Sequence, residues 1–198
     1  MIEPVKAALA AASLAVLLLA GCGSEPAAER AAPGPDAVVV ADAPQAADPA
    51  PPTPPIATAQ TLTLEGFGGL TIGKPVPAGS PWAARGAQIS EGCTEISAPD
   101  WPGAYAIVEE GVVRRITVSN KSEAKLLEGI GSGSTEADVR KAFPSFVAEP
   151  HKYVDAPAKY LTQPGNDPRL RFEIDAEGKV SLVHVGMMPT LAYVEGCA

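Results

Sequence analysis

The chain has 198 residues and carries 15 Lys and Arg against 23 Asp and Glu, a formal net charge of −8 at pH 7. This balance, with no basic stripe, excludes nucleic acid and anionic lipid surfaces as partners recognised by charge. Some of the basic residues form isolated pairs, which we interpret as solvated faces: Arg114–Arg115, Arg140–Lys141, and Arg169 with Arg171.

Residues 1–21 have the pattern of a bacterial lipoprotein signal peptide. Lys6 precedes an apolar stretch over 7–20, shorter than the ~20 residues that a membrane-spanning helix needs. The stretch closes on Leu19-Ala20-Gly21-Cys22, the form of a lipobox, in which a peptidase cuts before a cysteine that carries diacylglycerol. The alternative, an ordinary cleaved signal, would leave Cys22 as an oxidisable exported thiol. We predict that Cys22 is lipidated, and Gly23 after it resembles the sorting signal of lipoproteins on the periplasmic side of the outer membrane.

Residues 22–60 are predicted to form a disordered tether behind the lipidated cysteine. Ala and Pro dominate this segment, aromatic residues are absent, and five acidic residues stand against the single base Arg30. Such a composition cannot bury enough apolar surface to offset the entropy of ordering. As a flexible coil it would span ~35 Å, which holds the following domain away from the bilayer.

Two cysteines remain after Cys22, in a chain predicted to be exported. Cys93 and Cys197 form an even pair in an oxidising compartment, which favours one disulfide over two buried thiols. The bridge would fix the C-terminus, where chains otherwise fray.

Residues 61–198 have the length of one domain and contain a degenerate repeat, with halves of about 61–119 and 120–198. Residues 70–75 align with 130–135, and residues 105–113 align with 172–180. Each half predicts a strand, a glycine turn, a short helix and a two-stranded hairpin. The alternative is a chance similarity between two hairpins.

The second half gives the clearer prediction. Thr135 has the character of an N-cap for a helix that Pro144 ends, with Val139 and Phe143 on one face. Residues 170–174 alternate like a half-buried strand, a turn follows at Glu177-Gly178, and residues 180–185 return. In the first half, Ser80-Pro81 predicts a helix of about one turn over 82–85.

Four segments resemble a family of bacterial secreted proteins and lipoproteins for which no function is known. They are Gly129–Val139, Pro150–Tyr153, Leu170–Glu173 and Tyr193–Cys197. More distantly, the glycine turn, capped helix and hairpin resemble the SmpA/OmlA-type outer-membrane lipoproteins, and their doubling resembles the tandem fold of β-lactamase inhibitor proteins. These resemblances imply an α+β domain in which two repeats form one antiparallel sheet with helices on one face. The other face would be free to bind a protein.

The sequence carries few residues suited to catalysis. It lacks a phosphate-binding loop, a nucleophile elbow and a zinc-binding helix motif, so we expect no cofactor, no metal and no catalytic residue. His184 lies between two valines on a predicted strand, which favours a structural or merely solvent-exposed residue over a catalytic one. His151 has Asp155 and Glu195 as candidate partners for acid–base chemistry, although a hydrogen-bonded loop anchor is favoured.

The expected function is therefore a non-enzymatic binding module, anchored in the membrane by lipid. Its partner would be an envelope protein or a cell-wall polymer, bound by a patch that contains Trp101, His151, Tyr153 and Tyr160. For Trp101 itself, the favoured interpretation is that its ring folds back and plugs the core, and an exposed binding residue is the alternative. The alternative function is a small hydrolase or ligand-processing enzyme centred on His151, and an envelope spacer is a third.

Overall fold

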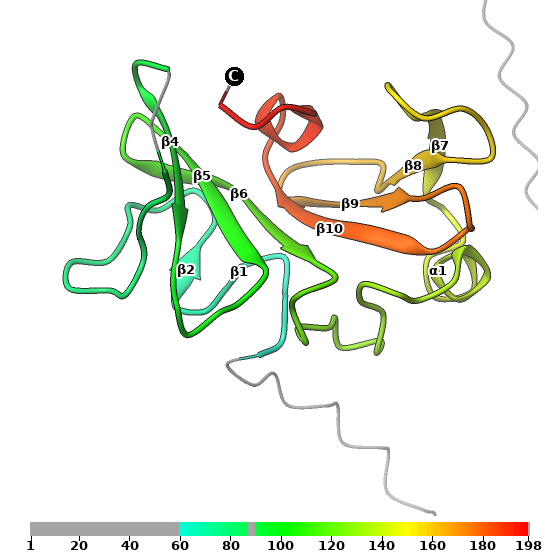
Figure 1. Cartoon of the computed structure of the whole chain (residues 1–198), viewed down its shortest axis with the longest axis horizontal. Coiled ribbons are helices and arrows are strands. Elements are labelled where there is room, and N and C mark those ends of the chain that lie inside the picture. Colours follow the sequence, from blue (N-terminus) through cyan, green and yellow to red (C-terminus); the bar gives the residue numbers. More distant parts are fainter. Residues whose placement is uncertain (1–59, 87–89, 198) are drawn as a thin grey trace, which may run out of the picture. The chain divides into compact units, whose positions relative to one another are not determined.

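The structure is a computed structural model that describes residues 60–86 and 90–197. The predicted signal peptide (1–21), the predicted lipidation site Cys22 and the predicted tether up to residue 59 lie outside the described residues. The described part consists of two antiparallel sheets, one α-helix and one 3-10 helix (Figure 1).

Eight strands form the main sheet in the order β3-β4-β5-β6-β10-β9-β8-β7. Strands β3 to β6 form one antiparallel meander, strands β7 to β10 form another, and the two meet where β6 pairs with β10 (Figure 1). The strands are β3 (Ala83–Ala84), β4 (Cys93–Ser97), β5 (Ala104–Glu109), β6 (Val112–Ser119), β7 (Val147–Pro150), β8 (Lys159–Thr162), β9 (Arg169–Ile174) and β10 (Val180–Gly186). A separate hairpin pairs β1 (Gly66–Phe67) with β2 (Leu70–Thr71).

The predicted α+β fold, with helices along one face of the sheet, is wrong. The described residues form a mostly β structure with a single short α-helix. Where the first repeat was expected to have its helix, Ala83–Ala84 form the edge strand β3. Gly79 and Gly86 flank this segment with positive φ values of 73° and 63°, so few residues remain for a helical turn. The backbone instead finds its hydrogen-bonding partners on β4.

The helix predicted in the second half is confirmed as α1 (Glu136–Ala142). The Thr135 hydroxyl accepts a hydrogen bond from the Asp138 amide at 3.2 Å, and Asp138 Oδ2 accepts one from the Thr135 amide at 3.1 Å. This capping box satisfies amides that lack partners inside the helix. Val139 is fully buried and attaches the helix to the core. The hairpin predicted after it is confirmed as β9 and β10.

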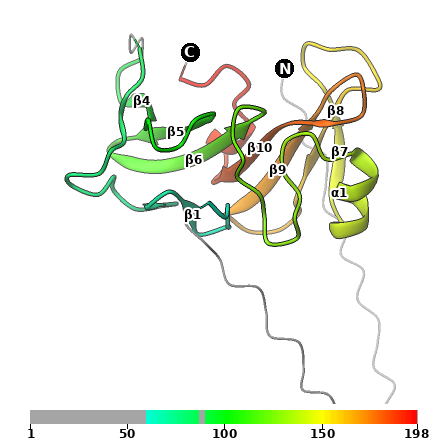
Figure 2. The ribbon, with the colours of Figure 1, turned by 60° about the horizontal axis from the view of Figure 1, so that its bottom comes forward.

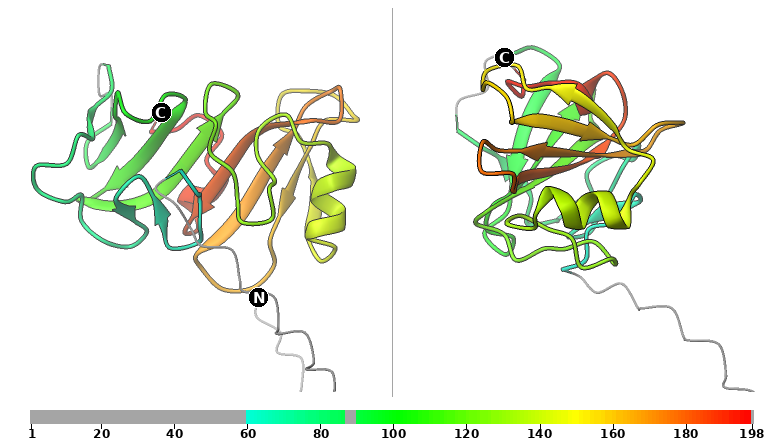
Figure 3. Two further views of the ribbon diagram at one scale, coloured as in Figure 1. Left: turned by 90° about the horizontal axis from the view of Figure 1, so that it is seen from below. Right: turned by 90° about the vertical axis from the view of Figure 1, so that its right-hand side faces the viewer.

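The hydrophobic core covers one face of the main sheet. On β9 the buried ring of Phe172 contacts Phe143 and Phe146, with ring centroids 5.7 and 5.8 Å away. The β1–β2 hairpin adds Phe67 and Leu70 to the same core. Figure 2 shows α1 beside β7, and the right-hand view of Figure 3 shows α1 below the strands of the second meander. The opposite face carries many polar side chains, together with the buried Ile107 of β5.

The predicted disulfide between Cys93 and Cys197 is confirmed. It joins β4 to the end of the C-terminal segment (187–197), which contains the 3-10 helix η1 (Thr190–Ala192). This segment folds back beside the first meander (Figure 1), and Ser90 Oγ donates a hydrogen bond to the Cys197 carbonyl. The C-terminus is thereby fixed to the sheet.

Candidate binding site on the polar face of the sheet

A row of polar side chains crosses five neighbouring strands on the face opposite the core. Tyr105 of β5 pairs with Thr117 of β6, Thr117 with His184 of β10, His184 with Arg171 of β9, and Arg171 with Thr162 of β8. Direct partners in antiparallel strands place their side chains on the same face. Three residues of this polar row (Thr117, His184 and Arg171) are buried although they are polar. Buried polar groups of this kind require hydrogen-bonding partners.

The carboxylate of Glu173 lies between the two histidines of the domain. His151 Nε2 is 2.8 Å from Glu173 Oε1, and His184 Nε2 is 3.8 Å from Glu173 Oε2. His151 Nδ1 accepts hydrogen bonds from the amides of Tyr153 and Val154, both at 3.1 Å. Since Nδ1 is an acceptor, the proton of the neutral ring lies on Nε2, which donates to Glu173. His151 therefore anchors the loop 151–158 to the sheet.

Burial sets the charge of the second histidine. His184 is 5% exposed, and this burial lowers its pKa to about 4, so the ring is neutral at pH 7. Its Nδ1 is 2.9 Å from the Thr117 hydroxyl. Burial alone would raise the pKa of Glu173, but the adjacent His184 and His151 outweigh burial and hold that pKa below its usual value. The site thus contains one carboxylate and two imidazoles that are already hydrogen-bonded.

Tyr160 and Arg171 continue the site toward β7. The Tyr160 ring stacks on His151 with centroids 4.7 Å apart, and the Arg171 guanidinium lies 4.0 Å from the Tyr160 ring centroid. Arg171 donates to Glu149 Oε2 at 2.7 Å and to the Thr162 hydroxyl at 3.0 Å. Tyr160 is buried, which raises the pKa of its hydroxyl. These contacts fix the ring of His151 from its second side.

Arg115 holds the C-terminal segment over the first meander. Its side chain is 1% exposed, and Nη1 donates to the backbone carbonyls of Thr190 and Tyr193. The Thr190 hydroxyl donates to Glu109 Oε2 at 2.7 Å. Burial lowers the pKa of Arg115, whereas Tyr105 and Glu95 oppose that change. The buried cation therefore stabilises the path of residues 190–193.

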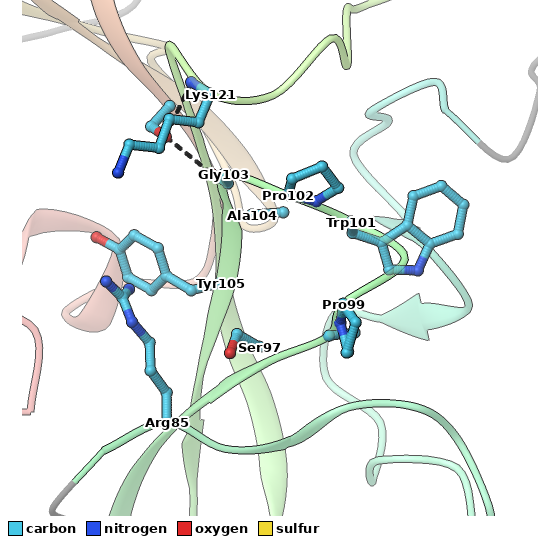
Figure 4. Close-up of a pocket in the computed structure, with 11 residues that line it drawn as sticks. Arg85, Ser97, Pro99, Trp101, Pro102, Gly103, Ala104, Tyr105 and Lys121 are labelled. Carbon is cyan, nitrogen blue, oxygen red and sulfur yellow. Dashed lines mark hydrogen bonds between the residues drawn. The ribbon is translucent and has the colours of Figure 1, made fainter.

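Part of the polar face stays open around Tyr105. A cavity of about 510 Å³ lies between the β4–β5 loop and the end of β6, and its lining includes Arg85, Ser97, Tyr105 and Lys121. Figure 4 shows that Arg85, Tyr105 and Lys121 extend to one side of the strands, whereas the ring of Trp101 points to the other side. The Arg85 guanidinium is 5.2 Å from the Tyr105 ring centroid. We call this hollow the Tyr105 pocket.

The four residues predicted to form one binding patch do not all lie together. His151, Tyr153 and Tyr160 meet at the 151–158 loop, where Tyr153 is 58% exposed and Tyr160 is buried. Trp101 lies in the β4–β5 loop, and three strands (β6, β10 and β9) separate β5 from β8; the Trp101 ring lies edge-on to Phe67 at 5.2 Å. The carboxylate that His151 contacts is Glu173, rather than Asp155 or Glu195. Glu195 instead pairs with Lys152, with Nζ 3.5 Å from Oε1.

The sequence interpretation missed the buried charges of the sheet. Arg115 and Arg171 were interpreted as parts of solvated pairs, and this is wrong, because they are 1% and 8% exposed. Their neighbours Arg114 and Arg169 are half-buried. Arg115 and Thr117 are two residues apart on β6, and side chains two apart on a strand lie on the same face. This spacing was the sequence signal that could have placed both residues on one face.

The two loops that flank the polar face expose apolar side chains. Tyr153 and Val154 belong to the 151–158 loop, and Tyr193 and Val194 belong to the C-terminal segment; they are between 36% and 58% exposed. The Lys152–Glu195 ion pair joins the two loops. We call these four side chains the apolar loop patch.

No family model, no curated protein and no solved structure matches this chain. Within residues 60–86 and 90–197, no group of three or more His, Cys, Asp and Glu side chains is arranged to hold a metal ion. The same ranges contain no helix of sufficient length and hydropathy to span a membrane.

Proposed function

We propose that this chain is a lipid-anchored lipoprotein of the bacterial envelope that acts as a non-enzymatic binding module on the periplasmic face of the outer membrane. The lipid anchor is proposed from the lipobox pattern that ends at Cys22 and from the outer-membrane sorting signal that Gly23 resembles. An anchor with two or more acyl chains would hold the protein firmly. The partner is an envelope protein or a cell-wall polymer.

The observation that carries the binding function is the apolar loop patch. Large exposed apolar side chains gathered on neighbouring loops are typical of interaction sites, and tyrosine is enriched among residues that dominate binding energy. Tyr153 and Tyr193 lie on loops that are each fixed to the sheet, one through His151 and the other through Arg115 and the disulfide. A preordered surface loses less conformational entropy when it binds.

The internal hydrogen bonds of the histidines support binding rather than catalysis. A general base needs a free lone pair directed at substrate. His151 Nδ1 already accepts two amide protons, and its Nε2 contacts Glu173. Buried His184 contacts Thr117 and Glu173. The alternative enzyme centred on His151 would have to break these loop contacts before each turnover.

Globomycin treatment of expressing cells tests the anchor. The drug blocks the peptidase that matures lipoproteins, so electrophoresis should show the precursor accumulating, and a Cys22→Ala variant should lack the lipidated mature form. An unchanged ratio of precursor to mature protein would contradict the lipid anchor without bearing on the binding surface.

Site-directed photo-cross-linking in intact cells tests the binding surface. A photoreactive amino acid at position 193 or 153 should yield a discrete adduct with an envelope component. The matched control is position 127, because Leu127 is 45% exposed and Tyr193 is 38% exposed. Equal labelling from position 127, or no adduct from 193 and 153, would contradict the proposal.

A further inference from the structure

The Tyr105 pocket has a charge that differs from the rest of the domain. Residues 61–198 contain 17 acidic and 13 basic residues, a net charge of 13 − 17 = −4. Among the described residues that line the pocket, Arg85 and Lys121 are cations and none carries a carboxylate. A local concentration of positive charge in a concave part of an acidic surface focuses the field on an anionic ligand.

The buried charge behind the pocket has the same sign. The Arg115 guanidinium lies 6.0 Å from the Tyr105 ring centroid, and the Arg85 guanidinium lies 5.2 Å from it. Arg115 Nε is buried without a hydrogen-bond partner. The wall of the pocket is thus backed by a buried cation, whose charge the carboxylate of Glu95 partly offsets.

The volume of the pocket and its uncharged lining residues indicate what kind of molecule carries the anionic group. A volume of about 510 Å³ lies within the range of small-ligand sites. Hydroxyl side chains at Ser97 and Tyr105 suit hydrogen bonding to a polyhydroxylated ligand, and Pro99 and Pro102 form an apolar edge. A flat anionic bilayer does not fit a concave site in a domain of net negative charge.

Gly103, at the edge of the pocket, packs its backbone tightly against Lys121 and Ser122. Its φ is 75°, and a Cβ atom there would lie 2.5 Å from the Ser122 amide nitrogen. The Ser119 hydroxyl donates to the Gly103 carbonyl at 3.0 Å, which fixes the strand end that positions Lys121 (Figure 4). Backbone packing therefore fixes the position from which Lys121 reaches the pocket.

We propose that the Tyr105 pocket binds an acidic sugar, one that carries a carboxylate or a phosphate. The ammonium group of Lys121 holds the anion, the Tyr105 hydroxyl donates to it, and Arg85 adds positive charge at the edge of the pocket. This site shares no residue with the apolar loop patch. A negative result for sugar binding here would therefore not contradict the proposed binding of a partner at that patch, and the reverse also holds.

Ligand-observed NMR with the full chain in detergent tests this proposal. The probes are glucuronate, which carries a carboxylate, and glucose 6-phosphate, which carries a phosphate; glucose is the neutral control. Saturable binding of either acidic sugar, with glucose at least about tenfold weaker, supports the site, since a hydrogen bond to a charged group contributes ~1.5–3 kcal/mol. The two acidic probes distinguish the carboxylate from the phosphate.

Variants locate the binding. Lys121→Gln should weaken binding of the acidic sugar at least about tenfold, because it removes a charged donor. Tyr105→Phe keeps the ring and should weaken binding by a smaller factor. The matched control is Lys141→Gln, since Lys141 is an exposed lysine on α1. Equal binding of glucose, equal affinities for Lys121→Gln and Lys141→Gln, or inorganic phosphate binding as tightly as the sugars (an adventitious ion only) would overturn the proposal.

Discussion

Removing the disulfide should cost the domain a large part of its stability. The bridge between Cys93 and Cys197 closes a loop with a sequence separation of 104. On the chain-entropy model a loop of this length contributes about 4.7 kcal/mol, by restricting the unfolded chain. This is an upper figure, because residual structure in the unfolded chain reduces it. We expect Cys93→Ala with Cys197→Ala to lower the free energy of unfolding by roughly 2–4.7 kcal/mol.

Urea denaturation followed by circular dichroism and tryptophan fluorescence measures this loss. Trp82 is 6% exposed and donates a hydrogen bond to the Gly68 carbonyl, so its emission reports on the folded core. The slope of the free energy against urea should rise, because the unfolded variant exposes more surface. Reduction of the unmodified protein should reproduce the loss, and reduction of the variant should change nothing. A loss below about 1 kcal/mol would refute the reasoning from loop closure.

Three further predictions concern His184, the helix cap and the core. Burial holds the pKa of His184 at about 4, below 6.5, so the unfolded state binds more protons and stability should fall as pH decreases from 6.5 toward 4. Over this pH range the free energy of unfolding should fall by on the order of 3 kcal/mol more in the unmodified protein than in His184→Gln. Urea titrations at each pH measure both proteins, and parallel curves of unfolding free energy against pH would contradict the prediction. Thr135→Ala removes the capping hydroxyl of α1 and should cost ~1 kcal/mol by the same assay, whereas an unchanged midpoint would argue against the capping box. Phe172→Ala empties a fully buried position and should cost ~3–5 kcal/mol, against a near-zero effect of Val147→Ala on exposed β7; similar losses from both would contradict the assigned core.

Local signals in the sequence predicted several elements correctly. Thr135, the acidic first turn and Pro144 defined α1, because capping and chain termination depend on neighbouring residues. Alternation along β9 identified that strand, and the counting of cysteines identified the disulfide. The helix and the strand were predictable because their signals lie in neighbouring residues. The disulfide was predictable because an even number of thiols in an oxidising compartment favours pairing.

Long-range pairing could not be predicted in the same way. The segment Ala83–Ala84 has high helix propensity, yet pairing with β4 makes it an edge strand. All four residues of β7 are exposed and the strand ends in Pro150, so its sequence has no buried alternation. His151, which follows β7, reaches Glu173 only through the registers of β7 with β8 and of β8 with β9, which the sequence alone does not define.

The most direct test of the central claim compares how much cross-linked partner is recovered with each of two matched variants. The claim is that a partner binds the loops beside the polar face through the apolar loop patch. Chemical cross-linking in intact cells and quantitative mass spectrometry would compare Tyr193→Ser with Leu127→Ser, two substitutions of similarly exposed apolar residues. We predict that Tyr193→Ser recovers at least about tenfold less partner, as loss of a binding hot spot of ~2 kcal/mol implies, and that Leu127→Ser recovers the same amount as the unmodified protein. Equal recovery by the two variants would contradict the account.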